Sequence, residues 1–206
     1  MKNHFRSCVC WGATALLLTQ LASAQAADIA WDANGGTGGN FTTAANWVGD
    51  VVPGSFDLAR INSNTSSLNP VTFASGSVTV DNINLGSSTP SFMEVNGGTL
   101  IALGIDITDF KIGADASQES TFTLSSGTIE FGIAGIYTDS NDFDIGKNGY
   151  GRYVQTGGLL QQHADDVKIA DSAGGIGYAD ITGGQMFVAD GFSVSDNVGG
   201  TGTLII

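Results

Sequence analysis

Five glycines recur in the same local frame along the chain, and this repeat constrains the fold more than any other feature. Apolar residues lie three and five positions before each glycine and two positions after it, with Gln155 as the one polar exception. An apolar period of two that resumes after a glycine predicts a strand, a bend at a residue without a Cβ atom, and a second strand. The intervals are 22, 29, 31 and 26 residues, and the glycines are Gly76, Gly98, Gly127, Gly158 and Gly184. The chain therefore uses one structural unit five times.

A second marker alternates with these corner glycines. It is an apolar–x–apolar triplet followed by a small residue, and it occurs at Ile83–Gly86, Phe110–Gly113, Phe143–Gly146, Val167–Ala170 and Phe192–Ser195. Each lap is thus expected to hold a strand into the corner, a strand out of it and a short third strand. Stacked laps of this kind place like residues in interior columns. One such column is expected to contain Val78, Leu100, Ile129, Leu160 and Met186.

These patterns predict an all-β fold, a right-handed parallel β-helix (β-solenoid) with a Trp-containing N-terminal cap. Five laps would form a stack about 20–25 Å tall at a lap spacing of about 4.8 Å. The alternative is an antiparallel sandwich with regular hairpins, which explains frequent turns but not two alternating markers. The 30 glycines and the abundance of β-branched residues also disfavour helix.

The first residues have the features of a secretory signal. Lys2 and Arg6 form a positive segment, a short apolar run ends at Leu21, and small residues flank Gln25 at the expected cleavage site. A retained N-terminal anchor is the alternative. The final residues lie inside the entering strand of a sixth lap, so a longer protein is expected. The predicted organisation is a signal peptide over 1–26, a cap segment over 27–69 and β-helix laps over 70–206, the sixth lap being truncated.

Composition limits the partners and the chemistry of the exported chain. Cys8 and Cys10 both lie in the predicted signal, so no disulfide or cysteine metal site is expected after its removal. Removal also leaves five basic residues against 20 acidic ones, a net charge of −15. Such a chain is a poor partner for nucleic acid and for anionic membrane surfaces.

The segment before the laps carries a family resemblance. It contains Trp31-Asp32, Ala45-Asn46-Trp47, Pro53-Gly54 and Asp57-Leu58-Ala59, and two Trp rings with Phe56 are expected to cover the first lap. The run resembles the start of secreted bacterial proteins with autotransporter-associated β-strand repeats, many of them PEP-CTERM-type exported proteins. The resemblance implies an exported, surface-associated protein, and it supplies no catalytic residues.

Residues suited to catalysis are sparse. His163 has acidic neighbours, but a single histidine in such a loop is more often solvated than catalytic. No nucleophile elbow, phosphate-binding loop or dinucleotide fingerprint occurs. Lys111 and Lys168 are expected at the same outward position of two short strands, and Asp144 is expected at that position on the lap between them. This stack is interpreted as a charge ladder on the surface.

Calcium is the remaining chemical option. Asp139, Asp142 and Asp144 cluster in the longest loop and are the candidates for Ca²⁺, because oxygen-rich loops suit this ion. The loop lacks the EF-hand order of ligands, and solvated loop acids are the alternative. No other cofactor is expected.

The sequence therefore predicts a non-catalytic, adhesin-like structural module of the cell surface or extracellular space. Surface glycans or envelope proteins are the expected partners, together with end-to-end association through the open last lap. The alternative function is a carbohydrate-active β-helix, a polysaccharide lyase or hydrolase whose site lies mostly outside this sequence. That chemistry needs clustered carboxylates beside a basic residue.

Overall fold

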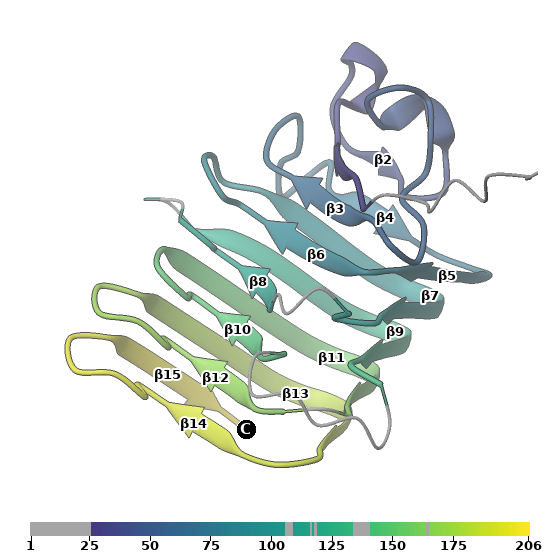
Figure 1. Cartoon of the computed structure of the whole chain (residues 1–206). Coiled ribbons are helices and arrows are strands. Elements are labelled where there is room, and N and C mark those ends of the chain that lie inside the picture. Colours follow the sequence, from purple (N-terminus) through teal and green to yellow (C-terminus); the bar gives the residue numbers. More distant parts are fainter. Residues whose placement is uncertain (1–25, 106–108, 116, 118, 134–140, 164) are drawn as a thin grey trace, which may run out of the picture.

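The chain forms a parallel β-solenoid of about six turns (Figure 1). The computed structural model describes residues 26–105, 109–115, 117, 119–133, 141–163 and 165–206. Residues 1–25 of the predicted signal therefore lie outside the described residues. Every pairing between the named strands of the solenoid is parallel, as the predicted β-helix requires. No helix among the described residues is long and apolar enough to cross a bilayer.

Short strands form one sheet of the solenoid. Their order is the order of the chain, because each lap adds one strand beside the strand of the previous lap. The predicted triplets supply the strands from β6 onward, and a residue with positive φ follows each of them. The strands are β1 (Asp28–Ala30), β3 (Leu58–Ile61), β6 (Asn82–Leu85), β8 (Phe110–Ile112), β10 (Phe143–Ile145), β12 (Val167–Ile169) and β14 (Phe192–Val194).

Longer strands form the second sheet and run through the corner glycines. The expectation of separate strands on either side of a corner holds only at Gly76, between β4 and β5. At the later corners the strand continues, because the neighbouring lap bends at the same place and pairing resumes after a local register shift. The strands are β2 (Gly39–Asn40), β4 (Val71–Phe73), β5 (Ser77–Val80), β7 (Phe92–Ala102), β9 (Ser120–Phe131), β11 (Tyr150–Gln162), β13 (Ile176–Val188) and β15 (Thr201–Ile205).

The interior consists of columns of stacked apolar residues. The predicted column is confirmed, because its five members are register partners from lap to lap. Its three central members, Leu100, Ile129 and Leu160, are fully buried. A second column stacks aromatic rings, with Phe110 and Phe143 at a centroid distance of 4.7 Å. Offset ring pairs of this kind contribute about 0.5–1.5 kcal/mol beyond the burial of their area.

Gln155, the polar exception in the repeat, also points into the core. Its side chain is fully buried, yet both ends have partners. The Tyr153 hydroxyl donates to Gln155 Oε1 at 3.0 Å, and Gln155 Nε2 donates to the Gln185 carbonyl at 2.9 Å. A buried amide is tolerated when its hydrogen bonds are made, so this lap keeps the inward register of the others.

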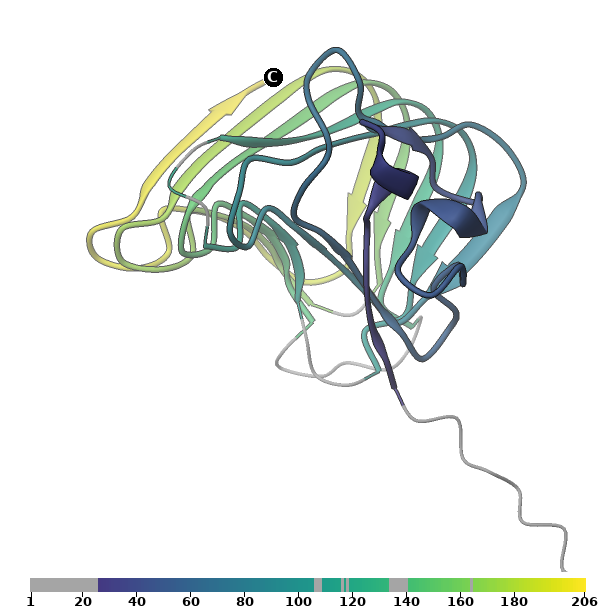
Figure 2. The same cartoon turned by 90° about the horizontal axis from the view of Figure 1, so that it is seen from above.

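The N-terminal segment closes one end of the stack (Figure 2). Trp31 and Trp47 are buried, with their rings 5.0 Å apart and nearly perpendicular, and Trp47 Nε1 donates to the Phe41 carbonyl at 2.7 Å. Phe56, expected to share this role, is instead 51% exposed because it lies in the turn before β3. The segment also contains the short helices η1 (Ala33–Gly35) and η2 (Ala44–Asn46).

The last two strands of the chain lie at the opposite end of the solenoid. β14 and β15 are the edge strands of the two sheets, and the C-terminus lies beside them (Figure 1). A hollow of about 390 Å³ lies between them, lined by core-facing residues that include Met186, Phe192 and Leu204. Association of two copies through this edge stays a prediction, which the concentration dependence of the mass in sedimentation would check.

Candidate functional site

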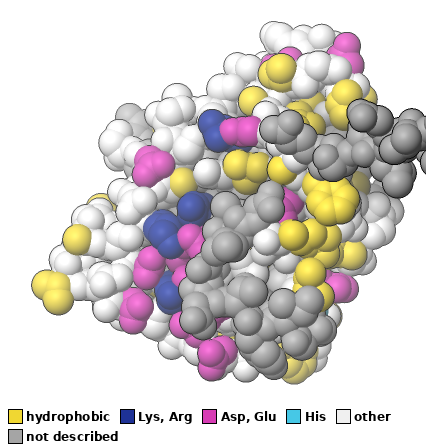
Figure 3. All heavy atoms as spheres, in the orientation of Figure 1, with side chains coloured by type: hydrophobic (Ala, Val, Ile, Leu, Met, Phe, Trp, Pro, Cys, Tyr) yellow, Lys and Arg dark blue, Asp and Glu magenta, His cyan; other side chains and the backbone are white. Residues whose placement is uncertain are grey.

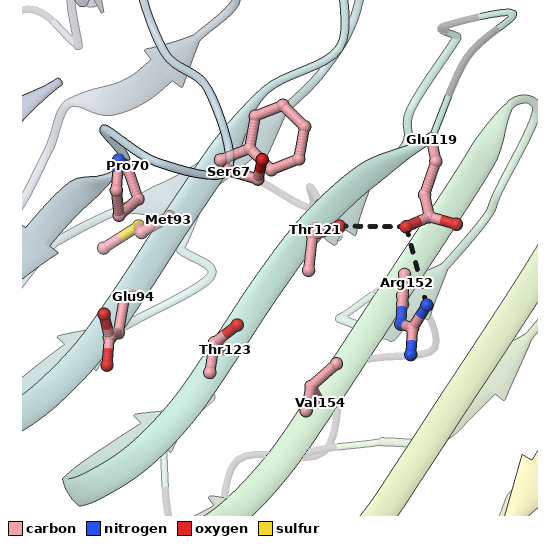
Figure 4. A pocket seen from close by; sticks show the side chains of 10 residues that line it. Ser67, Pro70, Met93, Glu94, Glu119, Thr121, Thr123, Arg152 and Val154 are labelled. Atoms are coloured by element: carbon pink, nitrogen blue, oxygen red, sulfur yellow. Dashed lines mark hydrogen bonds and ion pairs between the residues drawn. The ribbon is translucent and has the colours of Figure 1, made fainter. Parts of the chain in front are cut away.

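Two regions of the outer surface bring polar side chains together. One is a groove on the sheet of long strands, with a volume of about 280 Å³ (Figure 4). The other is a group of charged residues on the sheet of short strands, where Lys and Asp side chains intermix over β8, β10 and β12 (Figure 3). We call this second group the Asp–Lys cluster, and it contains Asp109, Lys111, Asp142, Asp144, Lys147, Asp165, Asp166, Lys168 and Asp171.

The groove is built from rows of outward side chains that cross β7, β9 and β11. In one row, Phe92 pairs with Thr121, Thr121 with Arg152, and Arg152 with Tyr178 of β13. In the next row, Glu94 pairs with Thr123 and Thr123 with Val154. Parallel, in-register laps place such neighbours about 4.8 Å apart along the solenoid. The groove therefore presents aromatic, hydroxyl and charged groups in a regular series.

Arg152 projects from β11 into the groove and makes no close ion pair with any described residue (Figure 4). Its guanidinium nitrogens lie 3.9 Å from a Glu119 oxygen and 3.9 Å from an Asp180 oxygen. Its Cζ atom lies 4.8 Å from the centroid of the Tyr178 ring, a cation–π contact. The side chain is 37% exposed. Its five N–H donors are thus held in place while some of them face solvent.

Glu119 lies at one end of the groove. Its Oε1 atom accepts a hydrogen bond from Thr121 Oγ1 at 3.2 Å. The Tyr150 hydroxyl also donates to Glu119, and this hydrogen bond raises the pKa of Tyr150. Glu94, the other carboxylate of the groove, points away from Glu119 and Arg152 (Figure 4).

The two groove carboxylates are too far apart for paired acid–base work. Glu94 is in register with Thr123, which lies four residues after Glu119. Four residues along a strand correspond to about 13 Å. Paired carboxyl groups of glycosidases are about 5–9.5 Å apart, so this pair does not match either geometry.

Lys147 is the centre of the Asp–Lys cluster. Its Nζ atom lies 2.6 Å from Asp109 Oδ2, 2.8 Å from Asp144 Oδ2 and 3.2 Å from Asp171 Oδ2. Asp109 precedes β8, Asp144 lies in β10 and Asp171 follows β12. One ammonium group therefore joins three successive laps.

The predicted ladder of Lys111, Asp144 and Lys168 is present as a column, but its ion pairs differ from the expectation. Asp144 is in register with both lysines. Among the described residues, however, Lys111 pairs with Asp109 at 3.6 Å and Lys168 pairs with Asp142 at 2.7 Å. Asp144 pairs with Lys147 and is fully buried, so it is not part of a solvated ladder.

Burial and mutual repulsion shift the titration of the cluster. Burial and the neighbouring Asp109 raise the pKa of Asp144 to about 8. Burial likewise raises the pKa of Asp142, although Lys168 offsets part of the effect. For Lys147, burial lowers the pKa, but the charge of Asp144 and two hydrogen bonds outweigh burial and raise it. The ionisation of each carboxylate in the cluster therefore depends on its burial and on the charges beside it.

The remaining residues singled out from sequence form no site with these groups. His163 lies in the loop after β11 with its side chain 25% exposed, and its Nε2 atom is 4.0 Å from Glu130 Oε2. Asp139, one of the three calcium candidates, lies outside the described residues. The structure brings the other two, Asp142 and Asp144, together with Asp109.

The groove was not predicted from the sequence, although the repeat determines which of its residues are aligned from lap to lap. Counting back six residues from the corners Gly127, Gly158 and Gly184 gives Thr121, Arg152 and Tyr178. Because the corner glycines stack from lap to lap, residues at the same number of positions before each corner also stack. Reading the outward offsets in the same way as the inward ones would have placed these side chains in one row.

The sequence was compared with protein-family models, with curated proteins and with solved structures, and none of the three comparisons gave a match. The resemblance to proteins with autotransporter-associated repeats therefore stays a prediction. The function has to be argued from the surface of the molecule.

Proposed function

We propose that this chain is a non-catalytic, adhesin-like β-solenoid module of the cell surface that binds glycans through the groove on its long-strand sheet. The observation that carries the proposal is the row of Phe92, Thr121, Arg152 and Tyr178 across four successive laps. A rigid sheet holds these groups at a constant spacing without loop movement. Such a surface suits an extended ligand with repeating units.

The chemistry of the groove fits a sugar better than an apolar ligand. Carbohydrates present apolar C–H faces that pack on aromatic rings and hydroxyl groups that need polar partners. Phe92 supplies a ring in the groove, while Arg152, which packs on the ring of Tyr178 beside the groove, and Glu94 supply charged partners for hydroxyl groups. Hydrogen bonds to charged groups are stronger than neutral ones and fix the orientation of a ligand.

The groove supports binding more than catalysis. The separation of Glu94 and Glu119 does not suit the alternative of a polysaccharide hydrolase. The other group of carboxylates lies in the Asp–Lys cluster, where Asp144 is fully buried and Asp142 is 5% exposed. A polysaccharide in contact with the outer surface would not reach these two side chains.

Export is part of the same proposal. The predicted signal over 1–26, the high negative charge and the resemblance to exported repeat proteins support a position in the envelope or outside the cell. A solenoid whose laps pair their backbone hydrogen bonds with one another also suits an exported chain that has no cysteine after residue 26 and therefore no disulfide to stabilise it. Protease added to intact cells would test this location, because a chain on the outer surface is expected to be cleaved while an internal marker protein is not.

The binding proposal can be tested with one matched pair of variants. The full chain is screened against an array of neutral and uronate-containing oligosaccharides, and a ligand that binds is then titrated by calorimetry. Arg152→Ala is expected to weaken binding by about tenfold or more, which corresponds to about 1.4 kcal/mol. Removal of the guanidinium takes away both polar contacts and the packing on Tyr178.

Arg60→Ala is the control, because Arg60 is also 37% exposed but lies on the other sheet, where it pairs with Asp28. This variant is expected to bind like the wild type. The proposal fails if no oligosaccharide on the array binds, and the assignment to the groove fails if both variants lose affinity equally.

A further inference from the structure

Three carboxylates from two neighbouring laps converge on the short-strand sheet. Asp109 precedes β8, and Asp142 and Asp144 lie at β10 of the next lap. One oxygen atom of each lies within 4.8 Å of the other two. Asp144 is fully buried and Asp142 is 5% exposed. Like charges so close in a buried region repel each other strongly and need compensation.

The lysines of the cluster satisfy only one side of these carboxylates. Lys147 contacts Asp109 Oδ2 and Asp144 Oδ2, and Lys168 contacts Asp142 Oδ2. The other oxygens, Asp142 Oδ1 and Asp144 Oδ1, are buried and have no hydrogen-bond partner among the described residues. A buried acceptor without a donor is rare in folded proteins and needs an explanation. Two such atoms on two members of one triplet indicate that these carboxylates are arranged to bind a ligand.

The net charge of the Asp–Lys cluster also favours the binding of a cation. Its six aspartates and three lysines give a net charge of −3 when all are ionised. A second triplet, made of Asp142, Asp165 and Asp166, adjoins the first and shares Asp142 with it. The side-chain Oδ1 atom of the adjacent Asn141 is likewise buried, and no described residue donates a hydrogen bond to it. Hard oxygen donors of this kind are the ligands preferred by Ca²⁺.

We propose that Asp109, Asp142 and Asp144 bind a divalent cation, and that this cation is Ca²⁺. Asp142 Oδ1 and Asp144 Oδ1 would be ligands together with Asp109 Oδ1, which accepts a 3.4 Å hydrogen bond from the Asp142 N–H. Lys147 and Lys168 would keep the opposite oxygens. The site differs from the predicted one, since Asp109 of the preceding lap joins Asp142 and Asp144. The ion would tie two laps together, so its binding should stabilise the solenoid. This inference is independent of glycan binding, because the groove lies on the other sheet.

The test uses the full chain, freed of metal with EDTA and dialysed. CaCl₂ is titrated by calorimetry, and the thermal midpoint is measured with and without the ion. We expect saturable binding at this site, a higher midpoint in Ca²⁺ and weaker binding of MgCl₂, because Mg²⁺ demands a stricter geometry and releases water reluctantly. Absence of both heat and midpoint shift in the wild type would overturn the proposal, and a shared proton would then explain the unpartnered oxygens.

Ca²⁺ binding by substituted chains tests which residues hold the ion. Asp142→Asn and Asp109→Asn, from the two laps, are each expected to weaken Ca²⁺ binding by at least about tenfold. Asp190→Asn makes the same charge change at an exposed residue and should bind Ca²⁺ like the wild type. Circular dichroism identifies any variant that fails to fold. Unchanged binding in both folded cluster variants would contradict the assignment.

Discussion

Replacing Lys147 with Met is expected to lower the free energy of unfolding by about 3 kcal/mol, the lower part of the range for breaking a buried ion pair. The substitution removes the ammonium group that contacts Asp109, Asp144 and Asp171 together. Asp144 is fully buried, so water cannot replace the lost ammonium. Protonation of Asp144, whose pKa is already raised to about 8, relieves part of the cost. The loss of unfolding free energy is therefore expected at the lower end of the range for a broken buried ion pair.

The effect should exceed that of a single salt bridge because Lys147 joins three laps. In a solenoid each lap contacts only its neighbours, and stability depends on the interfaces between laps. A defect at Lys147 weakens two successive interfaces. Chemical denaturation in metal-free buffer, followed by far-ultraviolet circular dichroism, measures the loss.

Lys111→Met is the matched control for this experiment. Lys111 carries the same side chain, is 26% exposed and, within the described part of the chain, forms an ion pair only with Asp109, at 3.6 Å. A partly exposed pair of this kind is worth about 0–1 kcal/mol. Equal losses in the two variants would show that Lys147 contributes no more than an ordinary surface charge.

The columns of the core could be predicted from sequence because strand geometry fixes them locally. Side chains alternate with a period of two, and a glycine marks each bend, so Leu100, Ile129 and Leu160 can be aligned without knowledge of the loops. The alignment survives insertions, since the loop between corner and triplet does not change the frame near the corner. The fold and the interior columns could therefore be predicted from the sequence.

The role of Lys147 could not be predicted in this way. Lys147 lies just after the strand β10, so the direction of its side chain depends on the turn at Gly146. Its partners Asp109 and Asp171 flank strands of other laps, at distances in sequence that vary with loop length. Register alone placed Lys111 and Lys168 beside Asp144, and it gave no information on which carboxylate each flexible ammonium reaches.

Replacing Gly127 with Ala is expected to destabilise the chain more than the same change at Gly76. Both glycines have a φ of +83°, so the cost of a left-handed backbone for alanine, about 1–2 kcal/mol, is common to the two variants. At Gly76 an added Cβ atom meets no atom within 4 Å. At Gly127 it would lie 2.7 Å from the Gly97 carbonyl carbon and 2.7 Å from the Gly98 oxygen.

These contacts are with the backbone of the preceding lap, so no side-chain rotation relieves them. The laps must separate at the corner, which strains hydrogen bonds on both sides of the bend, and overpacking of this kind costs a further 1–3 kcal/mol, roughly. The difference between the two free energies of unfolding thus measures how tightly the corners stack. Similar losses in Gly127→Ala and Gly76→Ala would mean that the glycines recur only for their backbone conformation. A larger loss at Gly127 would mean that the close approach of the laps also requires glycine.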